Sequence, residues 1–408
     1  MINKIRSLYE EYPKQFWVMM LGLFIDQLGG NIIYPFFTLY VTSKFGVGLT
    51  QVGLLLGAMT AGGIVGGLIG GSLADRFGRK KMLLFGLLTS GLYSVVIIFI
   101  NNFSWLFGVA ITVGFLGSMS GPASQAMLVD LLPEDKRTSG FGVLRVVFNM
   151  TVAIGPLIGG FISDYSYNWL FLCDAITSSI TFLLVLKMLP ETTPQKQADE
   201  EKSEKLSGAG YKAILRDRDF LILVGIFMLT FAVMVQMLST LSVFMRDVHG
   251  FPNKYYGYIL SFNAIIVVTL QFWVSRKAEK IPPLLAMVVG SIFATVGYTL
   301  FGFVNSIWFF ALAMAILTFG EMIIDPISQT LAAKFAPEDM RARYMAAFGF
   351  GLRLSNLVTP YLAGLLIDNY DPRWIWYTCG IVGTMTIFGY LMLYVRTRNQ
   401  GKKETAAA

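Results

Sequence analysis

The amino-acid sequence predicts an all-α membrane protein whose twelve transmembrane helices form two six-helix bundles. Three observations predict this fold. Of the 408 residues, 55% are hydrophobic and only 14% are charged, with a mean hydropathy of +0.62, a balance that a soluble chain cannot hide from water. The apolar residues gather in twelve long stretches with few charges, and a set of motifs recurs 204 residues further along the chain.

The composition also excludes several classes of protein. Two cysteines, Cys173 and Cys379, lie within apolar stretches and cannot form a disulfide framework, so we interpret them as packing residues. The net charge of +7 is not gathered into a basic run with aromatic residues, which argues against a nucleic-acid partner. The sequence has no nucleotide-binding glycine loop, no His/Cys metal cluster and no nucleophile-base pair. We therefore expect no enzyme, no cofactor and no metal site.

Each apolar stretch has the length of a transmembrane helix, which needs about 20 apolar residues to cross a core of roughly 30 Å. The runs are too long and too continuously apolar for the strands of a barrel. The first run follows a charged segment and has no small-residue cleavage site, so we interpret it as a retained helix and not a signal peptide. The predicted helices span 16–42, 49–74, 82–100, 104–130, 139–163, 169–189, 219–246, 254–275, 283–303, 307–334, 341–367 and 374–396.

The distribution of Lys and Arg predicts the orientation of the chain. The two termini and the loops after even-numbered helices carry 26 of these residues, whereas the opposite loops carry four, namely Lys44, Arg246, Lys254 and Arg373. Because cytoplasmic loops are enriched in positive charge, both termini are predicted to be cytoplasmic. We expect a multi-pass protein of the bacterial inner (plasma) membrane that acts as a monomer.

The sequence divides into two halves joined by a polar connector. Residues 190–218 contain Pro190, Pro194, Gly208 and Gly210 around a mixed charged run, which is typical of a solvated loop. The predicted organisation is an N-terminal six-helix bundle at 1–189, this cytoplasmic linker at 190–218 and a C-terminal six-helix bundle at 219–400. Residues 401–408 resemble the remnant of an expression tag and are left out of the argument.

The two halves are related by an internal repeat. Each residue of the following set has an identical residue 204 positions later: Pro122, Ser124, Gln125, Pro133, Glu134, Asp135, Arg137, Pro156, Gly160 and Asp164. One unshifted register matches all of them, so we interpret the halves as duplicated copies. Since each copy has six helices, both enter the membrane in the same orientation, which predicts a parallel repeat around a central cavity.

The loop after the second predicted helix reads Gly71-Ser72-Leu73-Ala74-Asp75-Arg76-Phe77-Gly78-Arg79-Lys80-Lys81. Together with the duplicated halves, this loop resembles the G-x-L-a-D-r-x-G-r-k signature of the major facilitator superfamily. The resemblance implies a secondary transporter that works by alternating access.

Within this loop the resemblance implies a conformational latch. Gly71 would permit close helix contact, Gly78 would allow the tight turn, and Asp75 would face the N-terminus of helix 11. Arg79 would pair with an acidic residue that ends helix 4, and Asp130 stands there. The alternative is that these charges only anchor the loop.

In the second copy of this loop the motif is not kept. Ser275, Glu279 and Pro282 occupy the places of the three motif residues that would form the latch in the first copy. We therefore expect an asymmetric latch, present mainly on one side.

The fifth predicted helix carries Gly155, Pro156, Gly159 and Gly160, which resemble the G-P-x-x-G-G motif of antiporting members of the superfamily. Proline bends a helix and the glycines let another helix approach, so the motif favours efflux over uptake. Ordinary small-residue packing is the alternative. Thr151 stands where the motif usually has a leading glycine.

Carboxylates within apolar helices are the predicted proton carriers. Asp26 lies in helix 1, where it resembles a motif of drug/proton antiporters, or it makes a structural hydrogen bond to Gln27, Asn31 or a neighbouring helix. An ionised carboxylate at the bilayer centre costs about 2.5–3.5 kcal/mol, so it should face a cavity or hold a proton. In helix 10, Glu321 and Asp325 share one face and would repel each other if both ionised. Asp325 is alternatively a gate residue.

Other residues are candidates for the substrate cavity. Arg145 and Arg353, which lie inside predicted spans, either pair with acids in the cavity or extend to the cytoplasmic face. The helix-4 arginine of the superfamily is absent here, so a proton route through it is not available. Aromatic and polar residues of helices 1, 7 and 8 would suit lipophilic or cationic ligands. They are Tyr34, Phe37, Phe231, Gln236 and Asn263.

From these residues and the resemblance we predict a proton-coupled exporter of small lipophilic or cationic compounds, driven by the proton gradient. Its partners would be the substrate, protons and the bilayer. A proton-coupled transporter of one defined solute, such as a sugar or lipid precursor, is the first alternative. A non-transporting membrane sensor is the second, although the chain shows no signalling domain.

Overall fold

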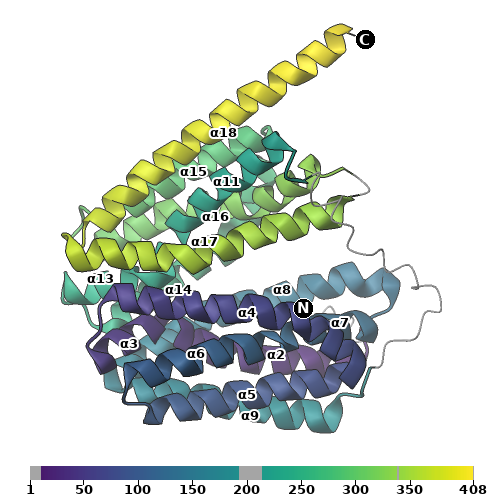
Figure 1. Ribbon diagram of the computed structural model, residues 1–408, viewed down its shortest axis with the longest axis vertical. Helices are drawn as coiled ribbons and strands as arrows, with labels where there is room; N and C mark the ends of the chain where they lie inside the picture. Colours follow the sequence, from purple (N-terminus) through teal and green to yellow (C-terminus); the bar gives the residue numbers. More distant parts are fainter. Residues whose placement is uncertain (1–10, 193–213, 338–339, 408) are drawn as a thin grey trace. The chain divides into compact units, whose positions relative to one another are not determined.

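The computed structural model describes residues 11–192, 214–337 and 340–407, and within them the chain is helical with no strand (Figure 1). Twelve spans in these residues are long and apolar enough to cross a membrane, so the predicted fold class is confirmed. Each coincides with one predicted helix. Most of the connector predicted at 190–218 lies outside the described residues, and the last helix continues to Ala407, through the segment excluded as a tag remnant.

The helices of the first half are α2 (Lys14–Ile33), the 3-10 helix η1 (Tyr34–Phe36), α3 (Phe37–Phe45), α4 (Leu49–Phe77), α5 (Arg79–Phe99), α6 (Phe103–Ser118), α7 (Ser120–Leu131), the 3-10 helix η2 (Glu134–Lys136), α8 (Arg137–Tyr165) and α9 (Tyr167–Met188). Those of the second half are α11 (Arg218–Met234), α12 (Gln236–Ser239), α13 (Leu241–Asp247), α14 (Asn253–Ala278), α15 (Pro283–Leu300), α16 (Ile307–Phe335), α17 (Arg341–Asn369) and α18 (Trp374–Ala407).

Helix boundaries repeat the 204-residue offset of the sequence motifs. The starts of α2, α4, α5, α6 and α8 lie 204 residues before the starts of α11, α14, α15, α16 and α17, respectively. The packing also repeats, since α2 packs against α8 and α9 while α11 packs against α17 and α18. In both halves the first helix is therefore held by the fifth and the sixth.

Three spans that the sequence analysis treated as continuous helices are broken. Pro35 has no amide hydrogen to donate, and the first span passes there through the 3-10 turn η1. The fourth span breaks at Met119, just before Pro122, and the Met119 amide donates to Leu116 O at 3.2 Å. The seventh has no proline at its break. There the Gln236 side chain donates to Ala232 O at 3.1 Å and accepts from Thr240 Oγ1 at 3.0 Å, which diverts backbone groups from the helix ladder.

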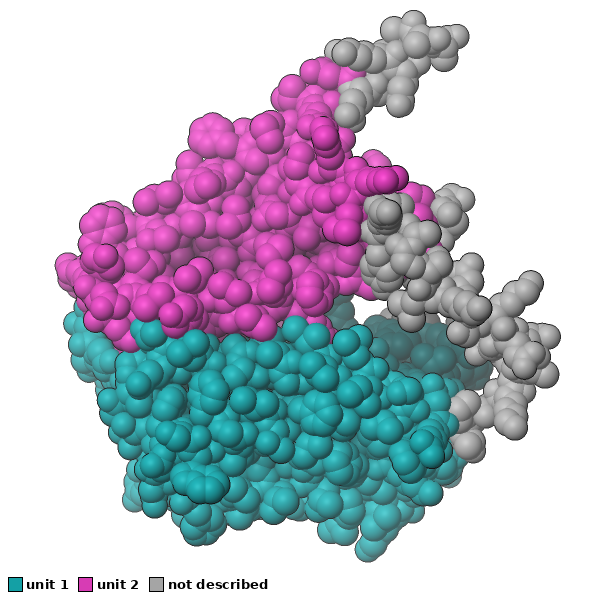
Figure 2. Space-filling model, in the orientation of Figure 1, with its two compact units in different colours: residues 1–198, 245–261 teal, residues 199–244, 262–408 magenta. Residues whose placement is uncertain are grey.

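Two compact units make up the chain: Met1–Ala198 with Met245–Ser261, and Asp199–Phe244 with Phe262–Ala408 (Figure 2). The segment 245–261 thus belongs to the first unit. Arg246 holds it there, because its guanidinium donates to Ser43 Oγ at 2.6 Å and to Leu39 O at 3.3 Å. Asn253 adds a hydrogen bond to Tyr167 Oη at 2.9 Å.

Glycines set how closely α4 and α6 pack within the first unit. A Cβ atom at Gly66 would overlap the backbone carbonyl of Phe115 on α6, whereas a Cβ at the neighbouring Gly67 would meet nothing within 4 Å. Backbone cannot move aside as a flexible side chain can. Gly66 therefore fixes the distance between these helices, and Gly67 does not.

We predict that Gly66→Ala lowers the stability of the protein and that Gly67→Ala leaves it nearly unchanged. The overlap at Gly66 forces α4 and α6 apart, at a cost of about 1–3 kcal/mol, typical of overpacking. Apparent melting temperatures of the two detergent-purified variants measure the difference. Equal melting temperatures would contradict the role assigned to Gly66.

Candidate functional site

The loop between α4 and α5 is built around Gly78, whose φ of 101° only glycine adopts readily. A Cβ at this position would lie 2.7 Å from the carboxylate of Glu191. That carboxylate accepts a hydrogen bond from the Lys80 amide at 2.8 Å and so satisfies a free donor at the start of α5. Glycine is required here both for the turn and for the approach of Glu191. The turn was predicted from the sequence, but the contact with Glu191 was not.

Arg79 forms an ion pair with Asp130, the contact that the resemblance implies, and its guanidinium also donates to Ala126 O at 3.4 Å. Asp75 is exposed at the end of α4. Gly71 does not make the close helix contact expected of it, because a Cβ there would meet only Pro122 Cβ, at 4.0 Å. The close contact is made instead by Gly70, against the backbone of Met119. The latch function of this loop remains a prediction.

The glycines of the fifth helix form a contact surface on both sides of α8. A Cβ at Gly155 would lie 2.7 Å from Asn31 Cβ, and one at Gly159 would overlap the Ile32 carbonyl. On the other side, a Cβ at Gly160 would lie 3.0 Å from the Cα of Lys254, at the start of α14. Any side chain larger than hydrogen at these positions would push α8 away from its neighbours.

Thr151, which replaces the leading glycine of this motif, has a contact of its own. Its hydroxyl accepts a hydrogen bond from Asn31 Nδ2 at 3.0 Å and donates to Phe148 O at 2.8 Å. The threonine is fully buried. This departure from the family pattern therefore adds a polar link between α2 and α8.

Asp26 lies on α2 at a cavity of about 380 Å³ within the first unit. Its carboxylate accepts a hydrogen bond from Ser178 Oγ of α9 at 3.0 Å, a neutral partner from a neighbouring helix, which is one of the alternatives expected for it. The other polar side chains that line the cavity carry amide or hydroxyl groups. They are Gln27, Ser90, Ser120, Ser124 and Gln125.

A second acid of the first unit, Asp174 on α9, was missed by the sequence analysis. It is 5% exposed, accepts a hydrogen bond from Ser94 Oγ at 2.5 Å and interacts electrostatically with Asp26. A Cβ at Gly29 would lie 2.8 Å from Asp174 Oδ1, so a glycine on α2 makes room for this carboxylate. The only signal in the sequence was an acidic residue six positions into an apolar stretch.

Glu321 is the buried acid of the second unit, with 8% of its surface exposed. Asn263 Nδ2 donates to its Oε2 at 3.0 Å, and the Tyr298 hydroxyl lies 3.2 Å from its Oε1. Asn263 also donates to Thr318 Oγ1 at 2.8 Å. The site is thus assembled from α14, α15 and α16, and the partners of the carboxylate are all neutral.

Asp325, Arg145 and Arg353, which were predicted for the proton path or the cavity, are exposed. Asp325 interacts electrostatically with Glu321. In the described part of the chain neither arginine forms an ion pair, so they do not neutralise Asp26 or Glu321. Phe37 is buried and Tyr34 is 53% exposed.

Among the helix-7 and helix-8 candidates, Phe231 is half-buried, Gln236 supports the helix break, and Asn263 belongs to the Glu321 site.

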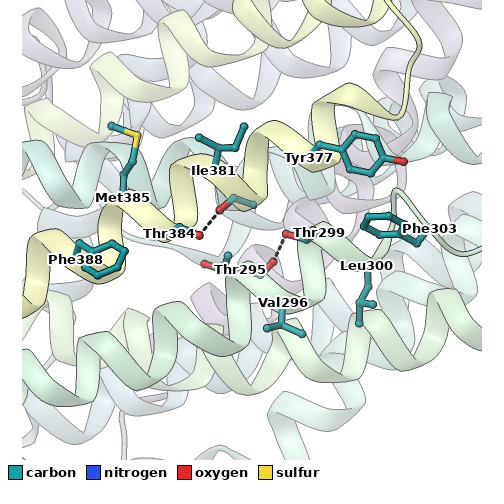
Figure 3. A pocket seen from close by; sticks show the side chains of 11 residues that line it. Thr295, Val296, Thr299, Leu300, Phe303, Tyr377, Ile381, Thr384, Met385 and Phe388 are labelled. Carbon is teal, nitrogen blue, oxygen red and sulfur yellow. Dashed lines mark hydrogen bonds between the residues drawn. The ribbon is translucent and has the colours of Figure 1, made fainter.

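A larger cavity, of about 870 Å³, lies between α15 and α18 and does not coincide with any of these groups (Figure 3). None of its eleven lining residues is charged. The hydroxyls of Thr299 and Thr384 donate to carbonyls of their own helices, Thr295 O at 2.6 Å and Gly380 O at 2.7 Å. The lining is therefore largely apolar. In the described residues no group of acidic, His and Cys side chains is arranged to hold a metal ion.

Twelve helices that are long and apolar enough to cross a membrane, with acidic side chains buried among them, are typical of a multi-pass membrane transporter. The family model of the Major Facilitator Superfamily matches residues 19–356 and 286–408, and the chain belongs to this superfamily. It is 27% identical to a "Na(+), Li(+), K(+)/H(+) antiporter" of Planococcus maritimus, over 94% of this chain and 97% of the relative. It is 24% identical to the "Multidrug resistance protein MdtH" of Yersinia enterocolitica, over 100% and 98%.

The solved structure of the nucleoside transporter NupG has the same fold, with a TM-score of 0.78 at 14% identity over 94% of this chain and 99% of that one. The bacterial relatives and the twelve spans support a multi-pass inner-membrane protein.

We predict that Gly155→Leu blocks conformational exchange more strongly than ligand binding. Gly155 packs against Asn31 of α2 and does not line the cavity at Asp26, so its replacement disturbs how α8 and α2 move against each other. Equilibrium binding and transport of a fluorescent cation by the purified variant separate the two effects. Gly142→Leu on the same helix is the control, because a Cβ there meets nothing within 4 Å. Equal loss of binding and transport at Gly155 would indicate a packing defect only.

We predict that Asp75→Asn slows transport by about tenfold, a usual size for coupling between states, while expression and folding stay nearly normal. The side chain is exposed, so its charge adds little to the core, and its interaction is expected in one conformational state. Transport rates and alkylation of single cysteines placed near either membrane face are the measurements. Unchanged rates together with unchanged alkylation would exclude a latch at Asp75.

Proposed function

We propose that this protein is a proton-coupled antiporter that exports lipophilic or cationic compounds by alternating access. The observation that carries the proposal is that both units hold acids in their membrane spans with neutral hydrogen-bond partners: half-buried Asp26 beside buried Asp174 in the first unit, and buried Glu321 in the second. A carboxylate in a membrane span without a basic partner must take up a proton or a cation to become neutral. The same group can thus bind either of two competing ions.

This competition is the basis of the transport cycle that we propose. When the site opens to the outside, a proton binds the carboxylate and displaces the cationic substrate. When the site opens to the cytoplasm, loss of the proton restores the negative charge that attracts the next substrate. The membrane potential contributes about 2.3 kcal/mol for each charge moved per 100 mV, so one net charge per cycle is a substantial driving force.

The cavity at Asp26 supports a small or narrow cationic substrate. Its volume of about 380 Å³ is at the lower end of the usual range for ligand sites, about 300–1,000 Å³. Its wall combines one carboxylate with hydroxyl and amide groups, and Leu23, Leu87, Leu128 and Phe148 supply apolar surface. Such a wall suits a positively charged group that carries an apolar body.

Two further observations support export by antiport. The glycine motif of α8 resembles that of antiporting members of the superfamily, and here it packs against two neighbouring helices. The names of two relatives, a cation/proton antiporter and a multidrug resistance protein, are consistent with a cation exchanged for protons.

Transport of one defined solute is the second candidate, and an inorganic monovalent cation is the form of it that the Asp26 cavity favours. Five of the lining side chains offer hydroxyl or amide oxygens beside the carboxylate, and hard cations prefer oxygen ligands. Proteoliposomes loaded in turn with sodium, potassium or tetraphenylphosphonium distinguish the candidates. Exchange of alkali ions alone would favour the second.

We predict that Glu321→Gln and Asp26→Asn each reduce gradient-driven transport by more than about tenfold while leaving the protein folded, because each removes a titratable group and keeps its shape. Substrate movement in proteoliposomes with and without an imposed pH gradient is the measurement. Glu279→Gln, a substitution of an exposed glutamate in the same half, should leave transport unchanged. Full gradient-driven transport in both acid variants would remove these residues from the mechanism.

A further inference from the structure

The hydroxyl of Tyr298 lies between the acid of the second unit and the break in the seventh membrane span. It is 3.2 Å from Glu321 Oε1 and 3.0 Å from the backbone carbonyl of Met234, the last residue of α11. Tyr298 is fully buried. Two acceptors therefore compete for one hydroxyl hydrogen, since a tyrosine donates a single hydrogen bond.

The number of available hydrogen atoms determines which acceptor, Glu321 or Met234 O, receives the Tyr298 hydroxyl hydrogen. Asn263 has two amide hydrogens, and they go to Thr318 Oγ1 and to Glu321 Oε2. If Glu321 carries a proton on Oε1, that proton is donated to the Tyr298 oxygen, and the Tyr298 hydrogen is free for Met234 O. Every group is then satisfied. If Glu321 is ionised, Tyr298 donates to the carboxylate, because a charged acceptor forms the stronger hydrogen bond.

The carbonyl of Met234 then needs another donor, and the regular helical donor for it is the Leu238 amide. In a continuous helix this amide would donate to Met234 O, four residues earlier. In the structure it donates to Val235 O at 3.1 Å instead, and this shorter bond is part of the break between α11 and α12. The break and a continuous helix are two alternative pairings of the same groups.

We propose that Tyr298 is a positioning residue that transmits the protonation of Glu321 to the seventh span. The protonated acid directs the Tyr298 hydroxyl to Met234 O and keeps the helix broken. The ionised acid withdraws that hydroxyl, and the helix closes through Leu238. This inference rests on the proposed function, in which Glu321 carries the transported proton, and it gives that proton a mechanical effect within the second unit.

Other ionisable groups near this network are few. Asp325, on the same helix as Glu321, and Cys379 of α18 both interact electrostatically with Tyr298. The negative charge of Asp325 disfavours a second charge on Glu321, which supports the protonated arrangement. The Gln236 side chain bonds Ala232 O and Thr240 within the break, so it does not compete for Met234 O.

Hydrogen exchange of the segment 235–240, corrected for the intrinsic effect of pH, tests the proposal on the full-length protein. In the wild type we expect exchange at Leu238 to be slower in alkaline than in acidic buffer, by on the order of five- to tenfold, because its bond to Met234 O belongs to a continuous helix whereas its bond to Val235 O belongs to the break, which opens more easily. Tyr298→Phe leaves Met234 O open to Leu238, so exchange should be slow at every pH. Glu321→Gln mimics the protonated acid, so exchange should be fast at every pH.

The opposite directions of the two variants distinguish a switch from a structural role. If Tyr298 only stabilised the fold, its loss would speed exchange throughout the unit. Tyr390→Phe is the matched control, because Tyr390 is an equally buried tyrosine of the same unit that contacts Thr230 at 3.1 Å, and the pH dependence should persist in it. Exchange that does not depend on pH in the wild type would overturn the inference, even if Glu321→Gln abolishes gradient-driven transport. Full transport by Glu321→Gln would instead overturn the proposed function.

Discussion

A lipid bilayer offers no hydrogen-bond partners to the groups that cross it, and the organisation of this protein follows from that constraint. Every backbone and side-chain polar group within a span must find a partner in the protein, or it costs several kcal/mol. Unbroken helices meet this requirement by themselves. Where a helix is interrupted, other groups supply the partner, as Tyr298 does for Met234 O. The carboxylates are the extreme case, because a hydrogen bond lessens the cost of their charge and only a proton or a cation removes it.

Close packing without a hydrophobic driving force is the second consequence of the bilayer. Since lipid tails are as apolar as leucine, helices associate through contact, and contact is greatest where a glycine lets one backbone reach another. Gly66 and Gly159 serve this purpose at α4–α6 and at α8–α2. Gly29 has a different role, because the space it leaves holds the Thr177 hydroxyl and the Asp174 carboxylate of α9. A glycine in these spans therefore makes room either for the backbone or for a side chain of the neighbouring helix.

How much of this could be read from the sequence depends on the range of the interaction. The spans, the repeat and the partner of Arg79 were predicted, because they rest on hydropathy, on identical residues in one register and on a known motif. Glu191, which caps α5, and Gly70, which makes the contact expected of Gly71, depend on which face of a helix meets a neighbour. The break of the seventh span after Met234 could not be predicted, because no proline stands there. Asp174 was missed because its hydrogen-bond partner, Ser94, is 80 positions away in the sequence and lies beside it only in the folded protein.

The repeat shows how two copies of one fold have come to differ in chemistry. Asp26 corresponds by the 204-residue offset to Thr230, and both side chains link the first helix of their half to the sixth, through Ser178 and Tyr390. Ser94 corresponds to Tyr298, and each hydrogen-bonds a buried acid, on the sixth helix in one half and on the fourth in the other. The positions of the polar contacts are thus shared, while the acids are not. Because the fold supplies the same positions twice, each half can hold a titratable group on a different helix, and the two groups need not respond to the same step of a transport cycle.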